Sequence, residues 1–295
     1  MKKKYFYIVL LLVMILLFGG CGAPKDIWDM ESYEQLDDII SIEEIEADGA
    51  ETVDTYKIRY KSDDCEVVSY ISIPQKYLTK QDACPCIIYC RGGNRNFSAN
   101  TPESVAYQAS VLGKIIFASQ YRGADGGTGK EEFGGSDVND VIKQIDLCEE
   151  FPFVDMDNLY MIGASRGGMM TYEAIRRDDR IKKAVVVSGV ADLFMWYEER
   201  ADMRLGLVTF IGGTPDKLPE EYEKRSATYW ADELKCPILL IHSKLDPRVS
   251  YAQAEKMVQC LEEAGMEYKV VSYEDDAHGY HYEDFEIITD WLKEE

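Results

Sequence analysis

The sequence predicts an α/β fold, with a mostly parallel central sheet covered by helices on both faces and preceded by an antiparallel hairpin. Short, continuous apolar runs alternate with helical patterns from about residue 86 onward, as expected for parallel strands buried on both faces. Two apolar segments between residues 52 and 73, separated by Lys61-Ser62-Asp63-Asp64, indicate the hairpin. With 295 residues, 46% of them hydrophobic, the chain can bury one large core.

The individual elements follow from the same patterns. Apolar runs bounded by polar or glycine-containing turns predict strands, and longer segments with apolar residues three or four apart predict helices. No internal repeat divides the chain, so residues 51–295 are expected to form one domain. We expect strands at 86–90, 115–119, 159–163, 184–188, 238–241 and 268–273, and helices at 103–112, 137–150, 166–177, 251–264 and 282–293.

The N-terminus has the pattern of an export signal. Three lysines precede an apolar run at residues 5–18, and two glycines and Cys21 follow. This resembles a bacterial lipoprotein signal peptide at residues 1–20, after which Cys21 would carry the lipid anchor, although Phe18 stands where Leu is usual. An uncleaved anchor helix is the alternative, and both interpretations place the rest of the chain outside the cytoplasm. Residues 21–50 are expected to form an acidic tether with at most one short helix.

The charge excludes several classes of partner. The chain has 32 Lys and Arg against 54 Asp and Glu, a formal net charge of -22, which would repel phosphate backbones and anionic membrane surfaces. Nucleic acid is therefore not an expected partner, and the lipid at Cys21 is the only membrane attachment expected. Cysteine and histidine spacing suggests no metal site. The seven cysteines after Cys21 are an odd number, so at least one thiol is free unless pairing is intermolecular.

The chemistry is concentrated at one strand-to-helix turn. Gly163-Ala164-Ser165-Arg166-Gly167 is a Gly-x-Ser-x-Gly motif between an expected strand and an expected helix. A nucleophilic serine needs such a tight turn, where little side-chain bulk surrounds the hydroxyl. The alternative is a glycine-rich turn with an incidental serine.

A nucleophilic serine also needs a base, oriented by an acid. Asp246 follows the apolar strand at 238–241, and His278 lies in a loop after the next strand, which gives the chain order Ser, Asp, His. The chain has three histidines. His242 is expected to be a hydrogen-bonded core residue, and His281 a solvated or supporting group. Asp275 or Asp276 could replace Asp246, but only if a turn folded them onto His278.

Several segments together resemble the catalytic domain of the prolyl oligopeptidase (S9) family of α/β-hydrolases. They are the Tyr121-Arg122-Gly123 loop, the serine turn with Met170 and Thr171, the segment 240–249 around Asp246, and His278-Gly279-Tyr280. The resemblance covers the chain from about residue 52 to the end. It implies an α/β-hydrolase fold and a triad of Ser165, Asp246 and His278 that requires no cofactor.

The sequence departs from the family at two places. Many members carry a β-propeller that gates access, and this chain leaves no room for one, so peptidase specificity does not follow from the resemblance. The family's oxyanion loop corresponds to residues 90–94, where no Tyr donor is present. Backbone N–H groups of Gly92, Gly93 and Arg166 are therefore the expected donors.

Four arginines are expected near the carboxyl ends of the strands, where ligands of α/β proteins bind. Arg91, Arg122, Arg166 and Arg248 would form a positive patch that favours anionic substrates. The alternative is that Arg122 and Arg248 form structural salt bridges. In the family, the long segment 191–233 lines the pocket for the residue before the scissile bond. Its aromatic residues Phe194, Trp196 and Tyr197 would then lie near that pocket or simply pack this segment onto the sheet.

The sequence thus predicts a lipid-anchored extracytoplasmic serine hydrolase acting on a small molecule or short peptide. An S9-type peptidase is favoured by the resemblance, and an acyl or carbohydrate esterase on the same triad is the alternative because the two share their chemistry. A catalytically silent surface binding lipoprotein is a third hypothesis, against which the ordered triad argues.

Overall fold

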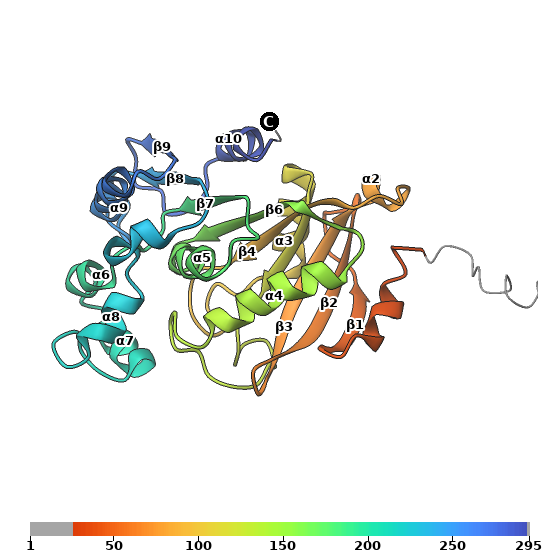
Figure 1. Cartoon of the computed structure of the whole chain (residues 1–295), viewed down its shortest axis with the longest axis horizontal. Helices are drawn as coiled ribbons and strands as arrows, with labels where there is room; N and C mark the ends of the chain where they lie inside the picture. The colour runs from red at the N-terminus through yellow and green to blue at the C-terminus, as the bar shows by residue number, and fades with distance from the viewer. Residues whose placement is uncertain (1–25, 294–295) are drawn as a thin grey trace, which may run out of the picture.

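The computed structural model describes residues 26–293, which form one mixed sheet with helices on both of its faces (Figure 1). The strand order is β1-β2-β3-β5-β4-β6-β7-β8-β9. Strands β1 to β3 and the β3–β5 pair are antiparallel, whereas all pairs from β5 to β9 are parallel. The strands are β1 Ile39–Ile45, β2 Val53–Ser62, β3 Cys65–Pro74, β4 Cys84–Cys90, β5 Ile115–Ser119, β6 Val154–Ala164, β7 Lys183–Val187, β8 Ile238–Ser243 and β9 Tyr268–Tyr273.

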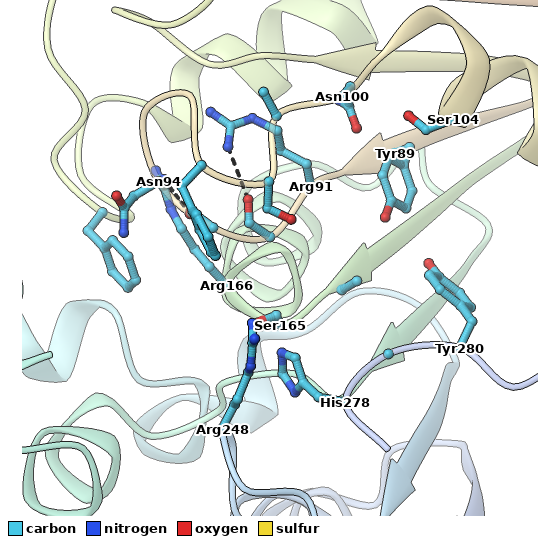
Figure 2. Close-up of a pocket in the computed structure, with 18 of the residues that line it drawn as sticks. Tyr89, Arg91, Asn94, Asn100, Ser104, Ser165, Arg166, Arg248, His278 and Tyr280 are labelled. Atoms are coloured by element: carbon cyan, nitrogen blue, oxygen red, sulfur yellow. Dashed lines mark hydrogen bonds between the residues drawn. The ribbon is translucent and has the colours of Figure 1, made fainter. Parts of the chain in front are cut away.

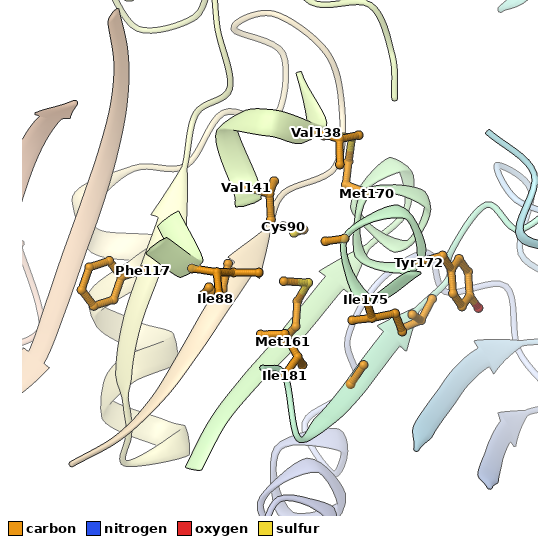
Figure 3. Packing of buried hydrophobic residues seen from close by; sticks show 14 of the residues in the cluster. Ile88, Cys90, Phe117, Val138, Val141, Met161, Met170, Tyr172, Ile175 and Ile181 are labelled. Carbon is orange, nitrogen blue, oxygen red and sulfur yellow. The ribbon is translucent and has the colours of Figure 1, made fainter. Parts of the chain in front are cut away.

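Helices cover the sheet because alternate residues of its strands point to opposite faces. On β4, Ile88 packs with Val141 and Met170 from α4 and α5, as Figure 3 shows, whereas Ile87 belongs to the second core with Val105 of α3. The helices are α2 Gln75–Leu78, α3 Pro102–Leu112, α4 Val138–Glu150, α5 Arg166–Arg177, α6 Leu193–Glu199, α7 Arg204–Ile211, α8 Pro219–Lys224, α9 Tyr251–Ala264 and α10 Asp284–Trp291, with 3-10 helices η1 Met30–Gln35, η2 Ala227–Tyr229 and η3 Ala231–Glu233.

The predicted fold class is confirmed. The hairpin is β2–β3, and each expected strand and helix is present within a few residues of its predicted bounds. Helices α6 to α8 form a cap at one end of the sheet (Figure 1), in the long segment where the sequence indicated only aromatic residues.

The expected tether at residues 21–50 is folded over much of its length. Strand β1 pairs with β2 at the edge of the sheet, and Tyr33 of η1 packs edge-on against Phe151 and Phe153. This strand was not predicted because the segment 39–46 contains three glutamates. They are tolerated at the edge of the sheet, where one face and one side of the strand are open to solvent. An acidic strand at an edge does not show the apolar run of a central strand.

The predicted signal peptide and the lipid anchor at Cys21 lie outside the described residues and stay predictions. Between residues 26 and 293, no helix combines the length and apolar character that crossing a membrane requires. The seven cysteines in this part of the chain are all unpaired.

Candidate active site

Ser165 lies at the tight turn between β6 and α5. Its backbone has φ 56° and ψ -122°, a conformation that costs about 1–3 kcal/mol and that surrounding packing must enforce. That packing depends on glycine on both sides. A Cβ at Gly163 would lie 2.1 Å from the Gly167 carbonyl oxygen, and a Cβ at Gly167 would lie 1.9 Å from the Cys90 carbonyl oxygen. The turn therefore holds Ser165 half-exposed between two closely packed backbones.

His278 and Asp246 form a hydrogen-bonded pair. His278 Nδ1 lies 2.8 Å from Asp246 Oδ2, so Nδ1 donates and Nε2 is left to face other groups. Asp246 Oδ1 accepts the N–H groups of Arg248 and Val249 at 2.8 and 3.1 Å. Three donors thus fix both carboxylate oxygens, which fixes the orientation of the imidazole.

The other candidate histidines and acids are engaged elsewhere. His242 is buried in β8 and donates to the Val249 carbonyl oxygen, and its burial lowers its pKa. His281 stacks on Tyr273 and bonds to Asp275 at 2.9 Å. Asp275 therefore bonds to His281, and Asp246 is the carboxylate that contacts His278.

The interactions of Asp246 make a prediction about stability and pH. Burial alone would raise its pKa, but the hydrogen bonds from His278 and from two backbone N–H groups lower it below the ordinary value. A lowered folded-state pKa contributes stability above the unfolded value of about 3.9, which is lost as pH falls through the folded value. Asp246→Asn should therefore unfold more easily at neutral pH, by about 1–2 kcal/mol.

The difference in the free energy of unfolding between wild type and Asp246→Asn should become smaller in acid. Urea unfolding of wild type and Asp246→Asn across a pH series measures it. A deficit of the same size at every pH would contradict the contribution assigned to the ionised carboxylate.

Ser165 and His278 line one cavity of about 370 Å³ at the carboxyl ends of the parallel strands. Figure 2 shows the His278 ring beside Ser165, with Arg248 next to both. Within the described part of the chain, the Ser165 hydroxyl has no hydrogen-bond partner. In unliganded enzymes, catalytic hydrogen bonds often tighten only when substrate binds.

The expected oxyanion donors lie on the same cavity. Gly92, Gly93 and Arg166 all line it, and a Cβ on Gly92 would come within 3.1 Å of the Ser165 Cβ. Arg166 is the first residue of α5, where helix geometry leaves the backbone N–H without an acceptor inside the helix. The amides of Gly92 and Gly93 also donate to no other described residue.

The structure corrects the expected positive patch. Arg91 and Arg166 are each 1% exposed, and both bond to Glu131 at 2.9 Å. Arg166 also pairs with Asp137. Burial alone would lower the Arg166 pKa, but the carboxylates of Glu131 and Asp137 raise it above its ordinary value. The guanidinium is therefore charged, and these two carboxylates balance its charge.

Arg122 does not line the cavity, because it forms a buried pair with Asp140 and also bonds to Asp63. Of the four predicted arginines, Arg248 is exposed to solvent and, within residues 26–293, forms no ion pair. The alternative of a structural salt bridge therefore holds for Arg122 and is wrong for Arg248. The pairing of Arg91 and Arg166 was missed because their partners Glu131 and Asp137 belong to a loop that only the fold brings to them.

Among the three aromatic candidates, Trp196 lines the cavity, where it stacks on Phe133 and donates to the Arg248 carbonyl oxygen. The expectation needs correction for the other two. Phe194 and Tyr197 are outside the cavity and pack on Tyr222, which holds the cap together.

A polar, uncharged wall of the cavity was missed by sequence reasoning. It comes from β4, from α3 and the loop before it, and from the loop after His278. Tyr280 belongs to the His278-Gly279-Tyr280 motif, but no motif marks the other four residues, whose segments have ordinary local patterns. The residues of the wall are Tyr89, Asn100, Ser104, Gln108 and Tyr280.

Comparisons with known proteins bear on the family and the fold of the chain. A model of the prolyl oligopeptidase family matches residues 103–295, well over half of the chain. The chain belongs to the prolyl oligopeptidase family. It is therefore a hydrolase with the α/β-hydrolase fold of that family.

Relatives within the prolyl oligopeptidase family carry peptidase names. The uncharacterized peptidase YtmA of Bacillus subtilis is 37% identical over 177 residues, which are 58% of this chain and 68% of YtmA. Dipeptidyl-peptidase 5 of Porphyromonas gingivalis is 24% identical over 79% of this chain and 37% of its own length. The solved puromycin-hydrolyzing peptidase of Mycobacterium tuberculosis is 25% identical, with a TM-score of 0.65 over 81% of this chain and 38% of that one. The chain thus spans less than two fifths of the latter two relatives.

Proposed function

We propose that the protein is a serine peptidase in which Ser165 is the nucleophile, His278 the general base and acid, and Asp246 the group that orients His278. The hydrogen bond between His278 and Asp246, on a cavity lined by Ser165 in its strained turn, carries this proposal. The family membership and the peptidase names of the relatives support amide bonds as the substrate class.

In the proposed reaction, the Ser165 oxygen attacks the substrate carbonyl carbon while His278 Nε2 takes its proton. The tetrahedral intermediate collapses when the C–N bond breaks and His278 returns the proton to the leaving amine. Water then attacks the acyl-Ser165 ester by the same two proton transfers and releases the acid. Asp246 has a pKa below its ordinary value, which favours its ionised form; it accepts the Nδ1 hydrogen bond and stabilises the imidazolium in both halves of the reaction.

Backbone amides would stabilise the negative oxygen of the intermediate. The Arg166 N–H at the start of α5 and the free N–H groups of Gly92 and Gly93 border the cavity next to Ser165. Donors held by the fold need no reorganisation during the reaction, and each contributes about 3 kcal/mol to lowering the barrier.

The charges around the cavity favour a particular substrate. No aspartate or glutamate in the described part of the chain lines the cavity, whereas the exposed Arg248 does. A substrate with a free ammonium group near the scissile bond would find no counter-charge here. We therefore propose acidic or uncharged acyl groups as the preferred class.

One substrate panel tests the function. Peptide p-nitroanilides with an acidic, neutral or basic residue before the scissile bond should be hydrolysed in that order of kcat/KM. Arg248→Gln should lower kcat/KM for the acidic substrate by about tenfold and leave the neutral one nearly unchanged. Lys244→Gln, which removes an exposed lysine paired with Glu274 outside the cavity, is the matched control.

The same panel separates the alternatives. Turnover of p-nitrophenyl esters without any anilide hydrolysis would make the protein an esterase, and no turnover of either would make it a binding protein. A preference for basic substrates would refute the role of Arg248.

Cleavage of a membrane-impermeant anilide by intact cells would follow from the export signal and lipid anchor predicted at Cys21, and cleavage only after lysis would contradict them.

A further inference from the structure

Buried side chains hold the loop after β4, residues 91–95, by donating hydrogen bonds to its carbonyl oxygens. The Arg91 carbonyl accepts from the Tyr121 hydroxyl at 3.0 Å, and the Gly92 carbonyl accepts from Arg91 Nη1 at 3.0 Å. The Gly93 carbonyl accepts from Arg166 Nη1 at 3.1 Å. Three consecutive peptide groups are therefore bound on their carbonyl side by buried side chains.

Binding the carbonyls sets the direction of the amides. In a trans peptide, the C=O of one residue and the N–H of the next point in opposite directions, and the described chain has no cis peptide bond. The groups that hold the carbonyls of Arg91 and Gly92 thereby turn the N–H groups of Gly92 and Gly93 away from themselves. Both glycines line the cavity, and neither amide has an acceptor in the described chain.

Glu131 joins the two arginines that hold this loop. One carboxylate oxygen accepts from Arg91 Nη2 at 2.9 Å, and the other accepts from Arg166 Nη1 at 2.9 Å and from the Arg95 backbone N–H at 2.8 Å. The Tyr121 ring adds to the cluster, because the guanidinium carbons of Arg91 and Arg166 lie 5.0 and 4.9 Å from its centroid. Figure 2 shows Arg91 and Arg166 together on the wall of the cavity near Ser165.

We propose that Glu131 is a positioning residue for the reaction, and that it acts through Arg91, which holds the Gly92 carbonyl, to aim the Gly93 amide at the developing oxyanion. Through Arg166, which holds the Gly93 carbonyl, Glu131 also fixes the next peptide of the same loop. The Gly92 amide is aimed by Tyr121, which holds the Arg91 carbonyl. Arg166 has two parts in this arrangement. Its backbone N–H, beside Ser165, supplies one donor, and its side chain fixes the loop that supplies the others. The inference rests on the proposed function, because an oxyanion forms only if Ser165 attacks a carbonyl.

The charges explain why Glu131 is needed. Arg91 and Arg166 both lie within hydrogen-bond reach of its carboxylate, so without that charge the two cations would face each other with Asp137 as the remaining neighbouring anion. Removing one partner of a buried ion pair leaves an uncompensated charge, which moves toward other acceptors or solvent. A guanidinium that moves releases the carbonyl it holds.

Glu131→Gln is the test, with Glu173→Gln as its matched control. Both side chains are carboxylates with 2% and 1% exposure and both bond to arginine, but Glu173 bonds to Arg177 at the far end of α5 and does not touch the loop. The amide nitrogen of glutamine cannot accept, so at least one of the three donors to residue 131 loses its partner. Hydrogen exchange of the peptide containing residues 91–95 and steady-state kinetics are measured on both full-length variants.

In Glu131→Gln, the backbone amides of residues 91–95 should exchange their hydrogens at least about tenfold faster than in wild type, because the loop opens more often. Its kcat should fall by about 10-fold to 100-fold with KM changed less than about threefold, since the oxyanion exists only in the transition state. Glu173→Gln should show neither effect.

Three results would overturn parts of this account and can be told apart. Unchanged hydrogen exchange of residues 91–95 in Glu131→Gln would refute the claim that Glu131 holds this loop through Arg91 and Arg166. Faster exchange with unchanged kcat would refute its catalytic role, and an equal loss of kcat in Glu173→Gln would show a general effect of buried charge removal. A wild-type protein that hydrolyses no ester or amide would refute the proposed function, while the exchange experiment would still decide whether Glu131 holds the loop.

Discussion

Ser165→Ala should lower kcat by about 10⁴-fold to 10⁶-fold, because the substitution removes the only proposed nucleophile and leaves binding and the backbone donors in place. The stability of the fold should change little. The Ser165 hydroxyl has no hydrogen-bond partner in the described chain, while its backbone N–H bonds to the Val187 carbonyl oxygen and is kept by alanine. The measurement is hydrolysis of the preferred p-nitroanilide or ester, with a thermal unfolding curve of each protein.

KM of any residual activity should stay within a few-fold of wild type, since the substrate contacts are retained. A loss of activity accompanied by a large fall in Tm would point to misfolding and not to chemistry. Retention of more than about 1% of wild-type kcat in a folded Ser165→Ala protein would exclude Ser165 as nucleophile.

Gly167→Ala should destabilise the fold by about 3 kcal/mol or more, a large part of the 5–15 kcal/mol of a typical domain. The added Cβ would lie 1.9 Å from the Cys90 carbonyl oxygen and 2.9 Å from that of Arg91. Both atoms belong to the backbone, so neither can rotate away, and β4 and α5 must move apart. The movement would also displace the turn that holds Ser165, so activity should fall with stability.

Gly206→Ala is the control for this change. Gly206 is inside α7 and has no atom within 4 Å of the position of a Cβ, so alanine should stabilise the helix by up to about 1 kcal/mol. Urea unfolding of both variants measures the difference. If Gly167→Ala were as stable as Gly206→Ala, the close approach of β4 and α5 at the serine turn would be incorrect.

The parts of the site that follow from local sequence could be predicted. The turn around Ser165 depends on glycines within two residues of it, and the order of Ser165, Asp246 and His278 is a property of the chain itself. The central strands could be predicted for the same reason, since each is a continuous apolar run. Each of these features is visible in a short window of residues.

The parts of the site that depend on contacts between distant segments could not be predicted from the sequence. Glu131 contacts Arg91 and Arg166, which lie 40 and 35 residues away along the chain. The sequence shows these arginines as charges but does not show that they are paired and buried, which is why the positive patch was predicted in error. The polar wall with Gln108 and Tyr280 is likewise assembled only by the fold.

The nucleophile is tested most directly by covalent trapping. The wild-type protein is treated with a fluorophosphonate, and the modified peptide is located by mass spectrometry. A nucleophilic serine with an oriented imidazole displaces fluoride and retains the phosphonyl group. The account predicts one adduct, on Ser165, that is absent from Ser165→Ala; an adduct on another residue, or labelling that persists in Ser165→Ala, would contradict it.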